Sequence, residues 1–139
     1  MEISIGNINK SELLQYLHST PLSEDVNIED YVSKVYSKAT IFVAWEGEGI
    51  AGVNIVYLND METRRGFVTY IHVNEKYRNM RVGWNLLQSA VDYGRAHQFE
   101  SIALEVRKNN EPAKHLYAKF GFVTYGENDI SYFMRKAIL

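Results

Sequence analysis

Residues 66–87 read GFVTYIHVNEKYRNMRVGWNLL, and the other elements of the chain are arranged around them. The first part is rich in β-branched and aromatic residues without a helix breaker, which predicts a strand. A polar turn follows, and a helix is expected to begin behind residues 78–83 (RNMRVG). Helix N-termini attract anions because their first N–H groups lack partners and the dipole favours negative charge there. With Arg78 and Arg81, this loop is predicted to hold a pyrophosphate, and a solvated basic turn is the alternative.

The residues before this stretch predict two helices and three strands. Ile3 and Ile5 alternate with polar residues, as in a short strand. Helical spacing follows over residues 13–17, capped by Asn9 or Ser11, and again over residues 28–36, capped by Asn27. Residues 41–45 and 50–57 are strand-like, and the EGEG sequence at 46–49 between them predicts a hairpin turn.

The residues after it predict two helices and three strands. We expect a helix over residues 82–97, a strand over 101–106, and a helix that starts near residue 111 with Pro112 in its first turn and Gly121 as its stop. Residues 122–125 and 130–136 predict a closing hairpin. The fold class is therefore mixed α/β: a mostly antiparallel sheet with a central parallel βαβ crossover, flanked by helices, in a single domain over residues 1–139.

Composition narrows the function classes. The chain of 139 residues has a net charge of -2, so no global field attracts a polyanion and nucleic acid is not an expected partner. Cysteine is absent, which excludes disulfides and cysteine-acyl intermediates and suits a reducing, cytoplasmic setting. We expect no secretory signal and no membrane span, because the apolar runs are strand-sized. The four histidines lack metal-ligand spacing, so no metal site is expected.

Two motifs at a fixed separation carry a family resemblance. The loop YRNMRVGWNLL and the later block LEVRKNNEPAKHLYAKFGF together resemble the GNAT superfamily of acyl-CoA-dependent N-acetyltransferases. The second block is most similar to the ribosomal-protein alanine N-acetyltransferase branch. The resemblance is strong over residues 67–122 and rests on topology alone before them. It implies the GNAT fold and acetyl-CoA as acyl donor.

The resemblance also assigns residues to the cofactor. The family's loop pattern is Arg/Gln-x-x-Gly-x-Gly/Ala, and here Arg81 replaces the first glycine while Gly83 keeps the last. Arginine at this place implies either an ordinary helical φ or a reshaped loop, and its side chain could pair with a phosphate of CoA. A bulge near Val73 is expected to expose backbone groups to the pantetheine and thioester. The implied cofactor-binding residues are Ile71, His72, Val73, Arg78, Asn79, Met80, Arg81, Val82, Gly83, Trp84 and Asn110.

The second block supplies candidate catalytic groups. Glu105 matches the branch's proton acceptor, often acting through water, and Tyr117 matches the proton donor to the CoA sulfur. Each has a structural alternative: a solvated strand carboxylate for Glu105, a core aromatic for Tyr117, and a helix cap for Asn110. Other family members carry a glutamate base at the position of Thr69. The nearby alternatives are Tyr70 and His72, and strand alternation predicts that both face away from Thr69, which disfavours His72 as the base.

Two functions from different classes follow. The first is direct transfer of acetyl from acetyl-CoA to a primary amine in a ternary complex. The alternative is a CoA-binding or regulatory module with little or no catalysis, favoured by Arg81 and Thr69. The sequence leaves the acceptor open among a peptide N-terminus, a polyamine, an aminoglycoside and an amino sugar. It also leaves the oligomeric state open, and a homodimer is possible. Acidic residues at the start of the second helix (Glu24, Asp25, Glu29 and Asp30) would suit a cationic acceptor, or stabilise the helix only.

Overall fold

The computed structural model describes all 139 residues and contains one seven-stranded sheet. Its strand order is β1-β2-β3-β4-β5-β7-β6. Every neighbouring pair is antiparallel except β4 and β5. This confirms the predicted fold class. The strands are β1 (Glu2–Ile5), β2 (Thr40–Glu46), β3 (Gly49–Tyr57), β4 (Arg65–Val73), β5 (Ser101–Arg107), β6 (Val123–Glu127) and β7 (Ser131–Ala137).

Three of the helices begin at asparagine caps that the sequence predicts. Asn9 caps α1 (Lys10–His18) in a reciprocal capping box with Glu12, and Asn27 caps α3 (Ile28–Val35). The helix α4 spans Val82–Ala96, and α5 (Glu111–Phe120) ends at Gly121, whose φ of 110° is open to glycine at little cost. The short helices α2 (Leu22–Asp25) and η1 (Glu75–Tyr77) were not predicted as helices. No helix in the chain combines the length and apolarity that a membrane crossing needs.

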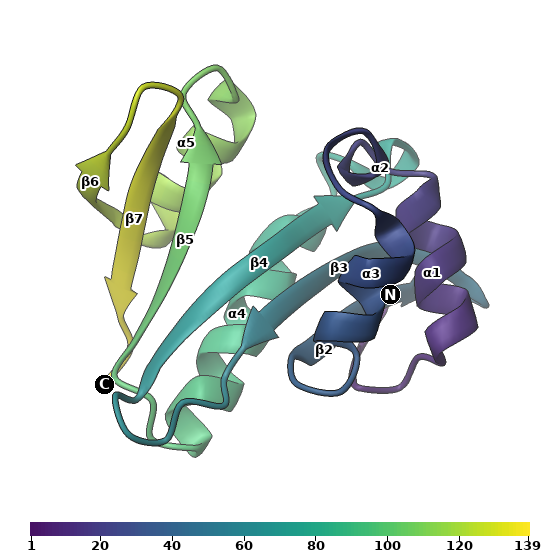
Figure 1. Ribbon diagram of the computed structural model, residues 1–139, viewed down its shortest axis with the longest axis horizontal. Helices are drawn as coiled ribbons and strands as arrows, with labels where there is room; N and C mark the ends of the chain where they lie inside the picture. Colours follow the sequence, from purple (N-terminus) through teal and green to yellow (C-terminus); the bar gives the residue numbers. More distant parts are fainter.

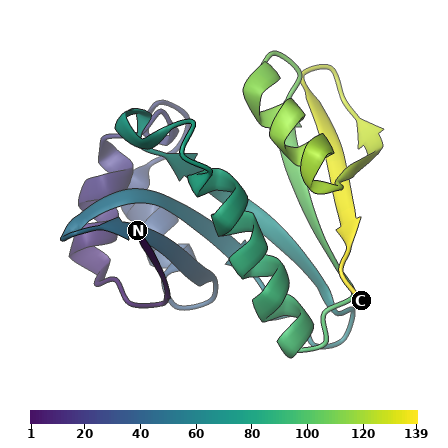
Figure 2. The ribbon, with the colours of Figure 1, turned by 180° about the vertical axis from the view of Figure 1, so that it is seen from behind.

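Two apolar layers cover the sheet. One packs α1 and α3 against β2 and β3 around buried residues such as Leu13, Val32 and Val43. The other packs α4 and α5 against the opposite face, around buried residues such as Leu86 and Leu104. Figure 1 shows α1 and α3 on the near face, and Figure 2 shows α4 and α5 together on the reverse face. The half of the sheet made by β5, β7 and β6 therefore has helical cover on one face only.

The only parallel pair is short, and the two strands separate beyond it. Register between β4 and β5 runs from Arg65 opposite Ser101 to Val68 opposite Leu104 and then stops. Both strands continue, β4 to Val73 and β5 to Arg107, without pairing with each other. The divergence is plain in Figure 1, where β4 and β5 start side by side and spread apart. Beyond this point, the β4 backbone groups that face β5 have no strand partner.

A β-bulge lies at Thr69, four residues before the place that the family resemblance implies. Register with β3 moves from Ile55 opposite Tyr70 to Val56 opposite Val68, so Thr69 is the extra residue. The expectation of a bulge near Val73 is therefore wrong in position. The bulge also places Thr69 on the α1–α3 face, the same face as Tyr70, because an inserted residue breaks strand alternation.

Candidate active site

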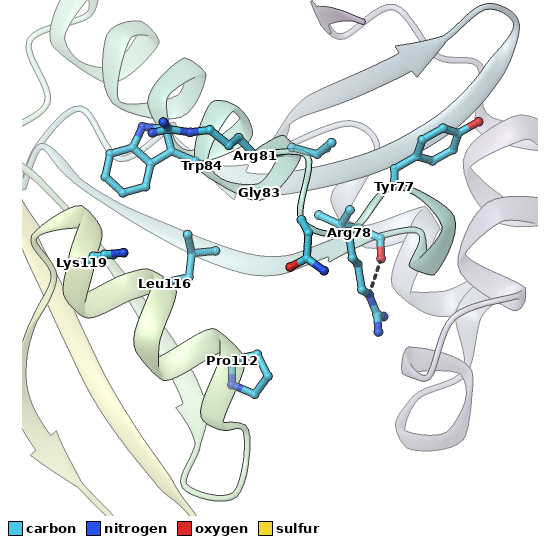
Figure 3. Close-up of a pocket in the computed structure, with 11 residues that line it drawn as sticks. Tyr77, Arg78, Arg81, Gly83, Trp84, Pro112, Leu116 and Lys119 are labelled. Atoms are coloured by element: carbon cyan, nitrogen blue, oxygen red, sulfur yellow. Dashed lines mark hydrogen bonds between the residues drawn. The ribbon is translucent and has the colours of Figure 1, made fainter.

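A first cavity of about 670 Å³ opens between the start of α4 and the side of α5. The loop before α4 forms one wall and α5 forms the other (Figure 3). Most of the predicted cofactor-binding loop lines this cavity, but Met80 does not, and this residue is 56% exposed. The lining residues are Val73, Tyr77, Arg78, Asn79, Arg81, Val82, Gly83, Trp84, Pro112, Leu116 and Lys119.

The start of α4 offers backbone donors to this cavity. Asn85 makes the first helical hydrogen bond, to the Arg81 carbonyl, and no side chain caps the N-terminus. The N–H groups of the first turn are thus left for an anion or water. Gly83 has a packing reason to be small, because a Cβ there would lie 3.1 Å from Cδ2 of Leu116 on α5. This glycine allows α4 and α5 to approach each other beside the donors.

Arg81 has a left-handed backbone conformation, which glycine adopts more readily than other residues. Its φ is 61° and its ψ is 20°, in the left-handed region, and Asn79 also has a positive φ of 67°. The alternative of an ordinary helical φ at Arg81 is therefore wrong. The guanidinium carbon lies 5.2 Å from the centre of the Trp84 ring, in cation–π geometry. The side chain thus lies back over the first turn of α4.

Three cations line the first cavity without a counter-charge. Arg78, Arg81 and Lys119 have no carboxylate within ion-pair distance, and no acidic residue lines the cavity. Arg78 donates from Nε to the Val73 carbonyl, 3.3 Å away, which directs it toward the end of β4 (Figure 3). The combination of free amides, unpaired cations and a glycine-type turn fits a bound diphosphate.

A second cavity, of about 460 Å³, occupies the separation of β4 and β5. It brings together Glu105 from β5, Tyr117 from α5 and Asn110 from the turn before α5, together with Thr69 and Ile71 from β4. The other lining residues are Leu22, Asp25, Phe67, Val68, Tyr70, Leu104, Val106, Arg107 and Ala113. Both cavities are lined by residues of β4 and α5. The first cavity takes Val73 from β4, and Pro112 and Leu116 from α5.

The candidate acid and base differ in environment. Tyr117 is buried, with 6% of its surface exposed, and burial raises the pKa of its phenol, with a smaller effect from Tyr70. No hydrogen bond within the protein acts on its hydroxyl, which is therefore free for a ligand in the second cavity. Glu105 is exposed and has no ion-pair partner. Asn110 caps α5, since its Oδ1 accepts from the Ala113 N–H at 3.2 Å, and it lines the cavity as well.

The β4 side chains near the bulge are held by tyrosines from the helices. Tyr31 of α3 is hydrogen-bonded to Thr69 through their hydroxyls at 3.1 Å, and Tyr16 of α1 meets Nδ1 of His72 at 2.8 Å. The prediction that His72 and Thr69 lie on opposite faces is wrong, because the bulge shifts Thr69 across. Burial, with the nearby Arg78 charge, lowers the pKa of His72 and so favours the neutral form of its ring. His72 lines neither cavity.

Several lining residues were not among the sequence-predicted site residues. Lys119 follows Leu116 by three residues on α5, so helical spacing alone could have placed both on the face toward α4. Of the four acidic residues that the sequence offers to a cationic acceptor, only Asp25, in α2, lines the second cavity. No three His, Asp or Glu side chains gather into a group that could hold a metal.

The acetyltransferase (GNAT) family model matches residues 7–122. An uncharacterized N-acetyltransferase, YsnE, of Bacillus subtilis (strain 168) is 30% identical over 99% of this chain and 100% of its own length. The crystal structure of the ribosomal-protein-S18-alanine N-acetyltransferase from Escherichia coli shares the fold with a TM-score of 0.79 and 20% identity, covering 99% of this chain and 94% of that one.

A Bacillus subtilis acetyltransferase solved in complex with CoA has a TM-score of 0.78 and 18% identity, over 99% of both chains. The family match spans both motifs of the sequence and the two cavities that the fold builds from them. The resemblance seen in the sequence is thereby confirmed. The chain belongs to the acetyltransferase (GNAT) family, and its enzyme class is that of the N-acetyltransferases.

Proposed function

We propose that this protein transfers acetyl from acetyl-CoA directly to a primary amine, with both substrates bound at once. The family uses acetyl-CoA and acts on amine acceptors. One observation carries the finer proposal: Glu105 and Tyr117, from different elements, line the same cavity where β4 and β5 separate. The first cavity, with its cations and helix N-terminus, then takes the diphosphate. The thioester reaches the second cavity by passing between β4 and α5.

The proposed chemistry divides two proton transfers between these side chains. The amine nitrogen attacks the thioester carbonyl, a C–N bond forms and the C–S bond breaks. Glu105 takes the amine proton, directly or through a water, because only a neutral amine has the lone pair for attack. Tyr117 gives a proton to the departing sulfur. The raised pKa keeps the phenol protonated beforehand, and the same burial makes a thiolate in this cavity a stronger base.

The β4 backbone has a separate role in this proposal. Its groups beyond Val68 on the β5 side have no strand partner, so an N–H among them is available to the thioester oxygen. A fixed backbone donor stabilises the negative charge that develops on that oxygen, a term worth about 10²–10³ in kcat in other enzymes. Thr69 does not replace the glutamate base of other members, since its hydroxyl is already bonded to Tyr31. Glu105 remains the base.

The test is thiol release from acetyl-CoA with a panel of primary amines. Glu105→Gln and Tyr117→Phe are each expected to lower kcat by about 10²–10⁴, the range for a lost proton-transfer group, while the Kd for CoA stays unchanged. Two exposed residues outside both cavities give matched controls: Glu48→Gln for the carboxylate and Tyr125→Phe for the phenol. Both controls should keep full rate.

The outcomes also separate the enzyme from the CoA-binding module. CoA binding without thiol release for any amine would favour the module and refute the transfer reaction. Full activity in Glu105→Gln and Tyr117→Phe would keep the reaction but remove these residues from it. Loss of rate together with loss of CoA affinity would assign them to binding instead of chemistry.

A further inference from the structure

The cations of the first cavity lie in two places. Arg78 is tied to the end of β4 through the Val73 carbonyl. Arg81 and Lys119 lie near Trp84 at the other end, Arg81 with the indole on the α4 wall and Lys119 on the facing α5 wall (Figure 3). A single diphosphate at the α4 N-terminus would use Arg78 and the helix amides. Arg81 and Lys119 would then have no part in binding the diphosphate.

Arg81 is fixed in position at a cost to the fold. Its φ of 61° is unfavourable for any residue with a Cβ, and glycine would relieve it. The Trp84 ring holds the guanidinium at 5.2 Å and is itself packed edge-on against Phe120, with ring centres 4.7 Å apart. Strained residues of this kind concentrate at functional sites. The strain and the aromatic support together point to a binding role for this guanidinium.

Lys119 is directed to the same place by the packing of α5. Its neighbours on that helix face contact α4, with Leu116 against Gly83 and Phe120 against Trp84. Lys119 is exposed and makes no ion pair, and no acidic residue lines the cavity. Two unpaired cations of different helices, on facing walls of one cavity, are suited to a doubly charged phosphate.

Acetyl-CoA carries such a second group, since its ribose has a 3′-phosphate apart from the diphosphate. We propose that Arg81 and Lys119 bind this 3′-phosphate, with Trp84 holding the guanidinium in place. The assignment rests on the proposed function and extends it. It also accounts for an arginine at a glycine-type position: the backbone serves the diphosphate while the side chain serves the second phosphate.

The test compares CoA with 3′-dephospho-CoA by calorimetry. The wild-type protein is expected to bind CoA about 10- to 100-fold more tightly, the range for one or two charge-assisted hydrogen bonds. Arg81→Gln and Lys119→Gln should each bring this ratio toward one by weakening CoA alone. Lys34→Gln, an exposed lysine of α3 outside the cavity, is the control and should keep the wild-type ratio.

A further variant separates binding from folding. Arg81→Gly should raise the midpoint of thermal unfolding, because glycine accepts the positive φ, and should still lose the preference for CoA. Equal affinity of the wild-type protein for both ligands would overturn the 3′-phosphate assignment and leave the proposed function standing. Absence of binding to either ligand by the folded protein would overturn the proposed function itself. An unchanged ratio in both glutamine variants would also refute the assignment.

Discussion

At the residue scale, His72 should make stability depend on pH. Burial and the Arg78 charge lower its pKa in the folded protein below the ordinary value of 6.5, and Tyr16 and Tyr70 are its other polar neighbours. The unfolded chain therefore takes up a proton first as pH falls. The folded protein therefore keeps its full stability with respect to His72 above about pH 6.5. Its free energy of unfolding falls progressively below that pH, as the pH approaches the lowered pKa.

Denaturant unfolding at a series of pH values between about 5 and 8 checks this expectation. His72→Gln, which can still accept from Tyr16, should show a shallower decline in the free energy of unfolding toward acid than the wild type. His115→Gln, on the exposed side of α5, is the control and should follow the wild type. The same acid slope in all three proteins would show that another group is responsible.

Arg81 shows what a single position can reveal from sequence. The loop pattern identified the position as one that favours glycine, and the structure does place it at positive φ. The pattern could not say where the arginine side chain would go, because that depends on the Trp84 ring and on the packing of α5 behind it. Arg81 and Trp84 are only three residues apart in the sequence, but the cavity that they line forms only when α5 packs against α4.

At the element scale, Asn110 is expected to serve two purposes that can be separated. Its side chain caps α5 through the Ala113 N–H, and Asn9 caps α1 through the Glu12 N–H at 2.7 Å. Asn110→Ala and Asn9→Ala should each lower the free energy of unfolding by about 1 kcal/mol. Asn110 lines the second cavity and Asn9 lines neither cavity of the site, so only the Asn110 variant should raise the KM for acetyl-CoA.

Thermal unfolding and steady-state kinetics of the two variants, side by side, check this pair. Asn9→Ala measures what a lost cap does to the enzyme when no cavity residue is removed. If both variants leave KM unchanged, Asn110 is a cap and nothing more. If both raise it equally, the effect is one of helix stability.

Elements with local signals were predictable, and those set by pairing were not. The start of α5 at Asn110 and its end at Gly121 follow from capping chemistry within a few residues. The bulge at Thr69 depends on register with β3, which is absent from a single strand's sequence. Because strand alternation was assumed through the bulge, the relative facing of Thr69 and His72 was predicted wrongly.

At the scale of the whole molecule, the separation of β4 and β5 creates the candidate site. The element order predicted a parallel pair here, but not that its register would end at Val68 and Leu104. Sequence also left open that β7, not β6, pairs with β5. This pairing completes the second half of the sheet, which carries Glu105, while the first half carries the bulged end of β4. The cavity lies where the two halves part.

The most direct test of this site is a crystal structure of the protein with CoA. We predict the diphosphate at the first turn of α4 and the sulfur in the cavity between β4 and β5, within about 3.5 Å of the Tyr117 hydroxyl. Glu105 should face the same cavity from β5, with room for an amine between the carboxylate and the sulfur. A sulfur outside this cavity, or one that contacts neither Tyr117 nor the free β4 backbone, would contradict the proposed placement of the thioester between β4 and β5.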